Sequence, residues 1–190
     1  QIPALSLIFF IFATLVIMNG NNLIDGANGL MPMAVLMQVL SLFFLAYELD
    51  DLNMQVSLLY LTIPLVIFLL FNYPWGKIFM GDFGAYFYGF MVSATTIIFF
   101  GEHPELPTWG AVLILFYPAF ELLFSIVRKK INGQDPTQPD PNHLHLKMYF
   151  LLRNQVIRPR ISNDLVMPCL SLIWGMPFFL IVWTFNSMAM

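Results

Sequence analysis

The stretch MQVSLLYLTIPLVIFLLF, residues 54–71, runs for 18 residues without a charge. A helix needs about 17–25 mostly apolar residues to cross the hydrocarbon core of a bilayer. Inside lipid, backbone N–H and C=O groups must bond within their own segment, so a run of this length forms a helix. The run contains Pro64, which membrane helices tolerate better than soluble ones.

Similar apolar runs lie on both sides of it, at about 2–18, 31–47, 84–100, 108–127 and 165–186. The chain has 190 residues, of which 59% are hydrophobic and 10% charged, whereas a soluble domain carries about 25% charged residues. A soluble core of this size cannot hide so many apolar side chains. We therefore predict an all-α polytopic membrane protein with about six transmembrane helices, in one integral-membrane domain over residues 1–190.

The segments between the runs are sorted by charge. All eight Lys and Arg residues lie in 72–83 or 128–164, whereas the charged residues of 48–53 and 101–107 are Asp and Glu, with one His. By the positive-inside rule, the basic segments face the cytoplasm. Alternation of the helices then places 19–30 on the cytoplasmic side as well, and both termini outside.

The first polar motif is NGNNLIDGANGL, residues 19–30. Its polar side chains recur every three positions, at Asn19, Asn22, Asp25 and Asn28, with glycines between them. In a helix these side chains share one face, and at a membrane edge such a row is suited to a nucleotide or a metal ion. The alternative is an interfacial loop, in which the same residues form caps and turns.

The second motif is NYPWGKIFMGDFGA, residues 72–85. Asp82 lies between Gly81 and Gly84, which leaves the backbone around its carboxylate open. Lys77 is the one cation of this loop and is placed to reach a lipid headgroup or a substrate phosphate. The alternative for Asp82 is the N-cap of the helix expected to start at residue 84.

The third motif is QPDPNHLHLKMY, residues 138–149. His143 and His145 form a weak zinc signature, because no further His or Cys completes a tetrahedral site. With Lys147 and the basic run 128–130 they are better suited to an anion such as a diphosphate. The alternative is a basic patch that holds anionic lipid.

All three motifs are expected on one side of the membrane. Mg²⁺ is commonly held by one or two carboxylates together with substrate phosphates. Asp25 and Asp82 supply carboxylates, and the histidine motif supplies anion-binding groups. The combination predicts Mg²⁺-dependent phosphoryl chemistry on a cytoplasmic nucleotide, with a lipid available from the bilayer.

On these residues the chain resembles the polyprenyl-phosphate N-acetylhexosamine-1-phosphate transferases of glycosyltransferase family 4, which are bacterial membrane enzymes. The family motif Asn-x-x-Asn-x-x-Asp-Gly-x-(Asp/Asn)-Gly-Leu matches residues 19–30. The motif Asn-x-x-Pro…Phe-(Met/Leu)-Gly-Asp-x-Gly matches at Asn72, Phe79, Met80, Gly81, Asp82 and Gly84, but its proline falls one position early, at Pro74, and is followed by Trp75. The motif Pro-Asp-x-x-His-Leu-His matches 139–145. The family's next histidine is Leu146 here.

The resemblance implies a reaction. The phosphate of an undecaprenyl-type lipid attacks the sugar-bearing phosphorus of a UDP-N-acetylhexosamine, UMP leaves, and surface polysaccharide synthesis begins. Mg²⁺, with Mn²⁺ as a substitute, would be held by Asp82 and Asp25. The catalytic residues implied are Asp25, Asp82, His143 and His145. The substrate-binding residues implied are Asn19, Asn22, Asn28, Asn72, Phe79, Gly81 and Lys77.

The implied partners are the UDP-sugar, the polyprenyl phosphate and the bilayer, with no nucleic acid; a homodimer stays open. The implied location is the bacterial inner membrane, with the active site on its cytoplasmic face. Family members also carry an Asp-Asp pair in an earlier cytoplasmic loop. The pair Asp50–Asp51 is expected outside, as a solvated turn. Because the chain starts at Gln1 inside an apolar run, we expect it to lack the family's N-terminal spans and to be inactive alone.

Two other functions stay open. The first is a non-catalytic membrane module that binds nucleotide-sugar or lipid phosphate. The second is a transporter or channel, for which Glu121 is the one acid well inside an apolar run. A structural role for Glu121, as a partner of Arg128 or at the edge of the cytoplasmic cavity, is the favoured interpretation. His103 receives no role.

Overall fold

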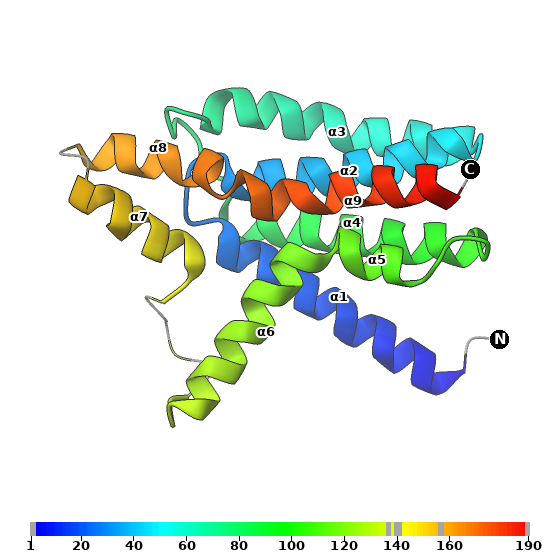
Figure 1. Cartoon of the computed structure of the whole chain (residues 1–190), viewed down its shortest axis with the longest axis horizontal. Helices are drawn as coiled ribbons and strands as arrows, with labels where there is room; N and C mark the ends of the chain where they lie inside the picture. The colour runs from blue at the N-terminus through cyan, green and yellow to red at the C-terminus, as the bar shows by residue number, and fades with distance from the viewer. Residues whose placement is uncertain (1–2, 136–137, 139–141, 156–157, 189–190) are drawn as a thin grey trace.

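The computed structural model describes residues 3–135, 138, 142–155 and 158–188, and within these ranges it contains helices and no strand. The all-α prediction is confirmed. Figure 1 shows the helices in chain order: α1 Ala4–Ile24, α2 Leu30–Glu48, α3 Leu52–Asn72, α4 Gly81–Glu102, α5 Trp109–Ile114, α6 Phe116–Ile131, α7 Leu144–Gln155, α8 Pro159–Cys169 and α9 Ser171–Met188.

Helix α2 is the centre of the bundle. It packs against α3 and α9, whereas α1 packs against α4 and α6. The buried side chains of α2 recur along its whole length and include Met31, Val35, Val39 and Leu42, none of which is exposed. The outer faces of α1 and α3 instead carry exposed apolar side chains, as expected of helices that face lipid.

Five segments of the described chain are long and apolar enough to cross a membrane: α1, α2, α3, α4, and α8 with α9 taken together as Pro159–Phe185. A polytopic architecture is therefore supported, but two predicted spans are not single helices. The last, 165–186, is divided at Leu170 between α8 and α9, and the fifth, 108–127, is divided at Leu115 into α5 and α6. The cause of the division at Leu115 is Pro118, since a proline ring collides with the carbonyl four residues earlier, here that of Ile114. Figure 1 shows α6 turning away from the bundle axis.

The contact between α1 and α4 is close because a glycine lies in it. A Cβ atom on Gly89 of α4 would lie 2.7 Å from the Cα of Met18 in α1. Without a side chain at this point the two backbones come together. This matters for function, because Asp25 ends α1 and Asp82 lies in the first turn of α4.

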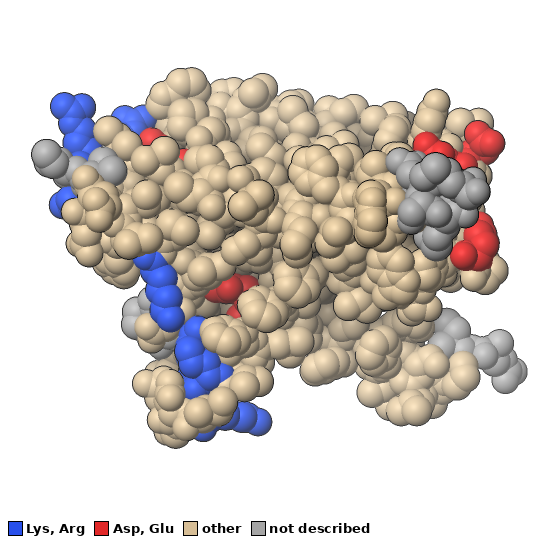
Figure 2. All heavy atoms as spheres, in the orientation of Figure 1, with Lys and Arg blue, Asp and Glu red and all other residues tan. Residues whose placement is uncertain are grey.

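The two ends of the bundle differ in charge. Figure 2 shows Lys and Arg side chains gathered toward the end where α7 and α8 lie. At the opposite end, formed by the α2–α3 and α4–α5 connections, Asp and Glu side chains are visible. The sorting of charge predicted from the sequence is therefore present in three dimensions. The assignment of the basic end to the cytoplasm stays a prediction.

The acidic end is held together by hydrogen bonds. Asp51 accepts a hydrogen bond from the Met54 N–H at 3.0 Å and so caps α3. Its other carboxylate oxygen lies 3.2 Å from His103 Nε2, and His103 Nδ1 lies 2.9 Å from Glu105 Oε1. Asp51 is therefore more than the solvated turn residue expected. His103, for which no role is predicted from the sequence, links the two connections.

Candidate active site

The predicted loop 19–30 is helical for half its length. Helix α1 continues to Ile24, so Asn19 and Asn22 lie in its last two turns. Asn19 Nδ2 donates to the carbonyl of Leu15 on the same helix, at 2.8 Å. Asn22 Nδ2 donates to the Tyr86 hydroxyl of α4, at 3.1 Å. The second bond joins the first motif to α4, one residue past the end of the second motif, and no pattern in the sequence indicates Tyr86.

Asp25 and Asp82 lie close together at the basic end. The Asp25 carboxylate accepts a hydrogen bond from the Gly81 N–H. Burial raises the pKa of Asp25 to about 6; the Gly81 bond opposes this rise and the charge on Asp82 adds to it. Two carboxylates that interact in this way favour a bound cation. Met80 holds the N-cap position and Asp82 lies inside the first turn of α4, so the alternative of Asp82 as N-cap does not hold.

The histidines reach the same place from α7. His143 directly precedes this helix and His145 lies in its first turn. Their rings are parallel, with centroids 5.8 Å apart and planes 1° apart. A Cβ atom on Gly26 would overlap His145 Nε2, so the ring lies directly against the residue after Asp25. The structure thus brings together the first and third motifs.

A buried carboxylate holds the histidine segment. Glu121 of α6 accepts a hydrogen bond from the Leu144 N–H at 2.7 Å, and its Oε1 lies 3.5 Å from His143 Nδ1. Glu121 therefore caps α7 and orients His143. A structural role for Glu121 is predicted from the sequence, with Arg128 or the cytoplasmic cavity beside it. The contact with the first residue of α7 is not predicted.

His145 acts as a neutral side chain. Burial lowers its pKa to about 4, the neighbouring His143 lowers it further, and Glu121 opposes the shift. At neutral pH the ring is uncharged, so it offers one hydrogen-bond donor and one acceptor. Cationic charge at this end comes instead from Lys and Arg, including Lys147 and the last turn of α6.

Asn72 joins the second motif to the first. Its Oδ1 accepts a hydrogen bond from the Gly29 N–H at 2.6 Å, and its Nδ2 donates to the Ile78 carbonyl at 2.9 Å. The side chain is buried. Both polar ends of the amide bond within the protein, so Asn72 holds two loops in register. Asn28 is bonded in a similar way, to residues discussed below.

The remaining candidates of the second motif lie on the surface. Phe79 is 75% exposed, which leaves its ring free to stack on a flat ligand. Lys77 Nζ lies 5.1 Å from the centroid of the Trp75 ring, at the distance of a cation–π contact. Their substrate-binding roles stay predictions. Residues 139–141 of the third motif lie outside the described residues.

The carboxylates of Asp25 and Asp82 suit a hard divalent cation that takes only a few of its ligands from the protein. Among the described residues no group of three or more His, Cys, Asp or Glu forms a metal cluster. Asp25 and Asp82 together offer carboxylate oxygens only, which suits Mg²⁺ with phosphate and water as its other ligands. In the described part of the chain no third ligand joins His143 and His145, so the weak zinc signature gains no support from the structure.

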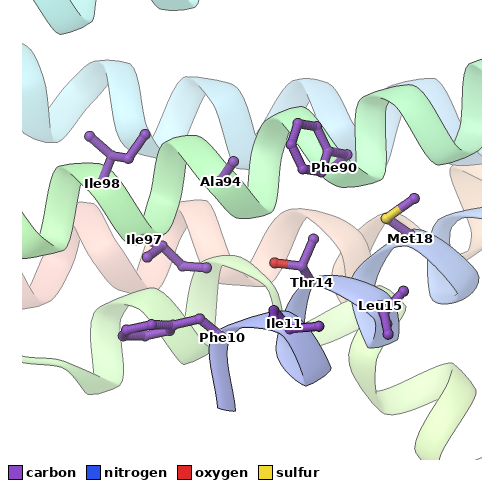
Figure 3. Close-up of a pocket in the computed structure, with 9 residues that line it drawn as sticks. All are labelled: Phe10, Ile11, Thr14, Leu15, Met18, Phe90, Ala94, Ile97 and Ile98. Carbon is purple, nitrogen blue, oxygen red and sulfur yellow. The ribbon is translucent and has the colours of Figure 1, made fainter. Parts of the chain in front are cut away.

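An apolar groove lies apart from this cluster. Figure 3 shows the residues that line it, on α1 and α4. The groove has a volume of about 400 Å³. Its lining is hydrophobic except for Thr14, and it ends at Met18, beside Asn19. No charged side chain lines it, so the polar chemistry of the protein belongs to the loops at the basic end.

Comparisons with known proteins identify the family. The family model for glycosyl transferase family 4 matches residues 1–100. An undecaprenyl-phosphate alpha-N-acetylglucosaminyl 1-phosphate transferase of Thermotoga maritima is 28% identical over 138 residues, or 73% of this chain and 41% of that protein. A probable undecaprenyl-phosphate N-acetylglucosaminyl 1-phosphate transferase of Bacillus subtilis is 33% identical over 144 residues, or 70% and 37%.

A phospho-N-acetylmuramoyl-pentapeptide-transferase of Streptococcus mutans is 28% identical over 146 residues, or 75% of this chain and 43% of that protein. The chain thus spans about two fifths of the length of the curated relatives it matches. The family match covers the two motifs that carry Asp25 and Asp82. The protein belongs to glycosyl transferase family 4.

Proposed function

We propose that the protein transfers an N-acetylhexosamine-1-phosphate from a UDP-sugar to a polyprenyl phosphate. An oxygen of the lipid phosphate forms a bond to the sugar-bearing phosphorus, the bond from that phosphorus to the bridging oxygen breaks, and UMP leaves. The main observation in support is that Asp25, Asp82 and His145 lie close together at the basic end of a membrane bundle. The names of the relatives support the same reaction class.

The residues of the site have complementary tasks in this proposal. Asp82, exposed in the first turn of α4, and Asp25, held by the Gly81 N–H, offer oxygens to Mg²⁺. When bound, the metal neutralises charge on the transferring phosphoryl group and polarises it. Neutral His145 donates a hydrogen bond to a phosphoryl oxygen beside Gly26. Phe79 stacks on the uracil ring, and Lys77 attracts the diphosphate.

The test is release of UMP from UDP-N-acetylglucosamine or UDP-N-acetylgalactosamine by the full-length protein in lipid nanodiscs with undecaprenyl phosphate. We expect turnover to require Mg²⁺ or Mn²⁺ and to stop with EDTA. Asp82→Asn should lower kcat by about 10²–10³-fold, the range found for loss of one preorganised electrostatic group. The control is Asp50→Asn, at the acidic end, which should leave kcat unchanged. Full turnover in Asp82→Asn would overturn the role of Asp82.

A second candidate is a non-catalytic module, which Leu146 favours because it stands where the family carries its next histidine. It predicts binding of a UDP-sugar without release of UMP. Calorimetry and the turnover assay on the same sample separate the two. A transporter role finds less support, because Glu121 is engaged with the first turn of α7.

A further inference from the structure

Asn28 is the meeting point of three segments that lie far apart in the sequence. Its N–H donates to Asn163 Oδ1 at 2.9 Å, and its Nδ2 donates to Asp164 Oδ1 at 2.9 Å and to the Pro74 carbonyl at 3.1 Å. Asn163 and Asp164 belong to α8, and neither is part of the three motifs. The start of the last membrane segment therefore contacts the first motif directly, and Asn28 links it to Pro74 of the second motif.

These bonds use all the donors of Asn28. An Asn residue has one backbone N–H and two hydrogens on Nδ2, and each has an acceptor here. Because Nδ2 donates to two acceptors, the orientation of the side-chain amide is fixed, and Oδ1 remains as an acceptor. That oxygen lies against Gly76, where a Cβ atom would be 2.9 Å away and where φ is +56°. The geometry around the amide is therefore specified on both sides.

The network continues from Asn28 into the second motif. The next residue, Gly29, donates its N–H to Asn72, and Asn72 donates to the Ile78 carbonyl. Ile78 directly precedes Phe79, the residue expected to stack on the uracil ring. A path of hydrogen bonds, with the peptide link from Asn28 to Gly29 as its one covalent step, thus runs from α8 to the loop that would bind the nucleotide.

We propose that Asn163 and Asp164 are positioning residues for the nucleotide-sugar part of the site, an inference that rests on the proposed function. They do not contact substrate. They act through Asn28, whose amide Asp164 holds by a charge-assisted hydrogen bond, a stronger kind than one between neutral groups. Loss of either acceptor frees a donor of Asn28 and loosens the loops on which the nucleotide rests.

Steady-state kinetics in nanodiscs test the proposal. In Asp164→Ala we expect the KM for UDP-N-acetylglucosamine to rise about tenfold, with kcat within threefold and the KM for undecaprenyl phosphate unchanged. The control is Asn154→Ala, on the exposed surface of α7. A merely structural role would lower thermal stability and the active fraction, and so lower kcat while the donor KM stayed the same. That result overturns the proposal.

A reversed pair tests the same bond without depending on one truncation. Asn28→Asp places two carboxylates together and should raise the donor KM. Adding Asp164→Asn restores a bond with donor and acceptor exchanged, and should recover at least part of the loss. A double variant no better than Asn28→Asp alone contradicts the assignment. This pair also decides the matter if Asp164→Ala does not fold.

Hydrogen–deuterium exchange gives a readout that does not require activity. In Asp164→Ala, amides of 25–30 should exchange faster than in the unmodified protein, while those of 48–53 keep their rates. Unchanged exchange at 25–30 overturns the positioning role. If no variant releases UMP but exchange changes as expected, the proposed function fails while the contact between α8 and Asn28 stands.

Discussion

The His145 ring can lie directly against Gly26 because glycine has no side chain; a Cβ atom there would overlap the ring. The site is built from such single contacts: the Gly81 N–H on Asp25, the Tyr86 hydroxyl on Asn22, and the His145 ring on Gly26. The Gly81 and His145 contacts each join two motifs, and the Tyr86 contact joins the first motif to α4. At the scale of residues, the motifs are therefore parts of one polar cluster.

Gly26→Ala tests this closeness. The added Cβ would overlap His145 Nε2, so the ring must move away from Asp25. We expect at least a tenfold fall in kcat for UMP release, because small displacements of a catalytic group cost large factors in rate. Gly101→Ala is the matched control, since a Cβ there has no neighbour within 4 Å. Equal activity of the two variants would show that the His145 position does not matter.

Among the elements, α6 and α7 depend on each other through Glu121. Removing its carboxylate in Glu121→Ala leaves the Leu144 N–H without its acceptor. We expect the free energy of unfolding to fall by about 1–3 kcal/mol, the cost of an unsatisfied buried polar group. Glu121→Gln keeps an acceptor but removes the charge beside His143, so stability should be nearly retained while kcat falls.

Thermal unfolding and UMP release on the same samples measure the difference. Glu102→Ala, an exposed acid at the other end, serves as control. Identical behaviour of Glu121→Ala and Glu121→Gln would contradict separate roles for the hydrogen bond and the charge.

The connections at the acidic end predict a dependence of stability on pH. Partial burial lowers the pKa of His103, but the hydrogen bonds to Glu105 and Asp51 outweigh it, so the pKa lies above the ordinary 6.5. The bond from the Met54 N–H is the largest cause of the lowered pKa of Asp51. A raised His pKa stabilises the fold fully below pH 6.5, and this contribution is lost as pH rises through the folded value.

The unfolding temperature should therefore decline slightly from about pH 6 toward pH 8. A lowered Asp51 pKa acts in the opposite direction, since its contribution is present above the ordinary 3.8 and lost in more acidic solution. His103→Gln should flatten the decline above pH 6. If the unfolding temperature of His103→Gln declined with pH as steeply as that of the unmodified protein, His103 would not be the cause of the decline.

Over the full bundle, the charge of the two ends predicts how the protein is oriented in the membrane. The basic end holds the candidate site, and the acidic end holds the His103 cluster. In a Cys169→Ser background, Asn53→Cys and Asn154→Cys place one thiol at each end. On spheroplasts, an impermeant maleimide should label Asn53→Cys and not Asn154→Cys. Labelling of Asn154→Cys from outside would invert the orientation.

The sequence predicted the helices because each apolar run is set by the length of a bilayer and the need to satisfy its own backbone. The split at Leu115 escaped prediction, although Pro118 was visible, because a proline in a membrane run either kinks or is tolerated according to its neighbours. Pro64 and Pro177 lie inside continuous helices.

The fold class, the charged ends and the motif residues could be predicted from composition and spacing, because these act locally along the chain. Which polar groups are in contact depends on how the helices pack. Tyr86 on Asn22, Glu121 on Leu144, and the α8 pair on Asn28 join residues up to 136 positions apart. No local pattern specifies such pairs; they follow from how close the helices pack, which glycines such as Gly89 permit.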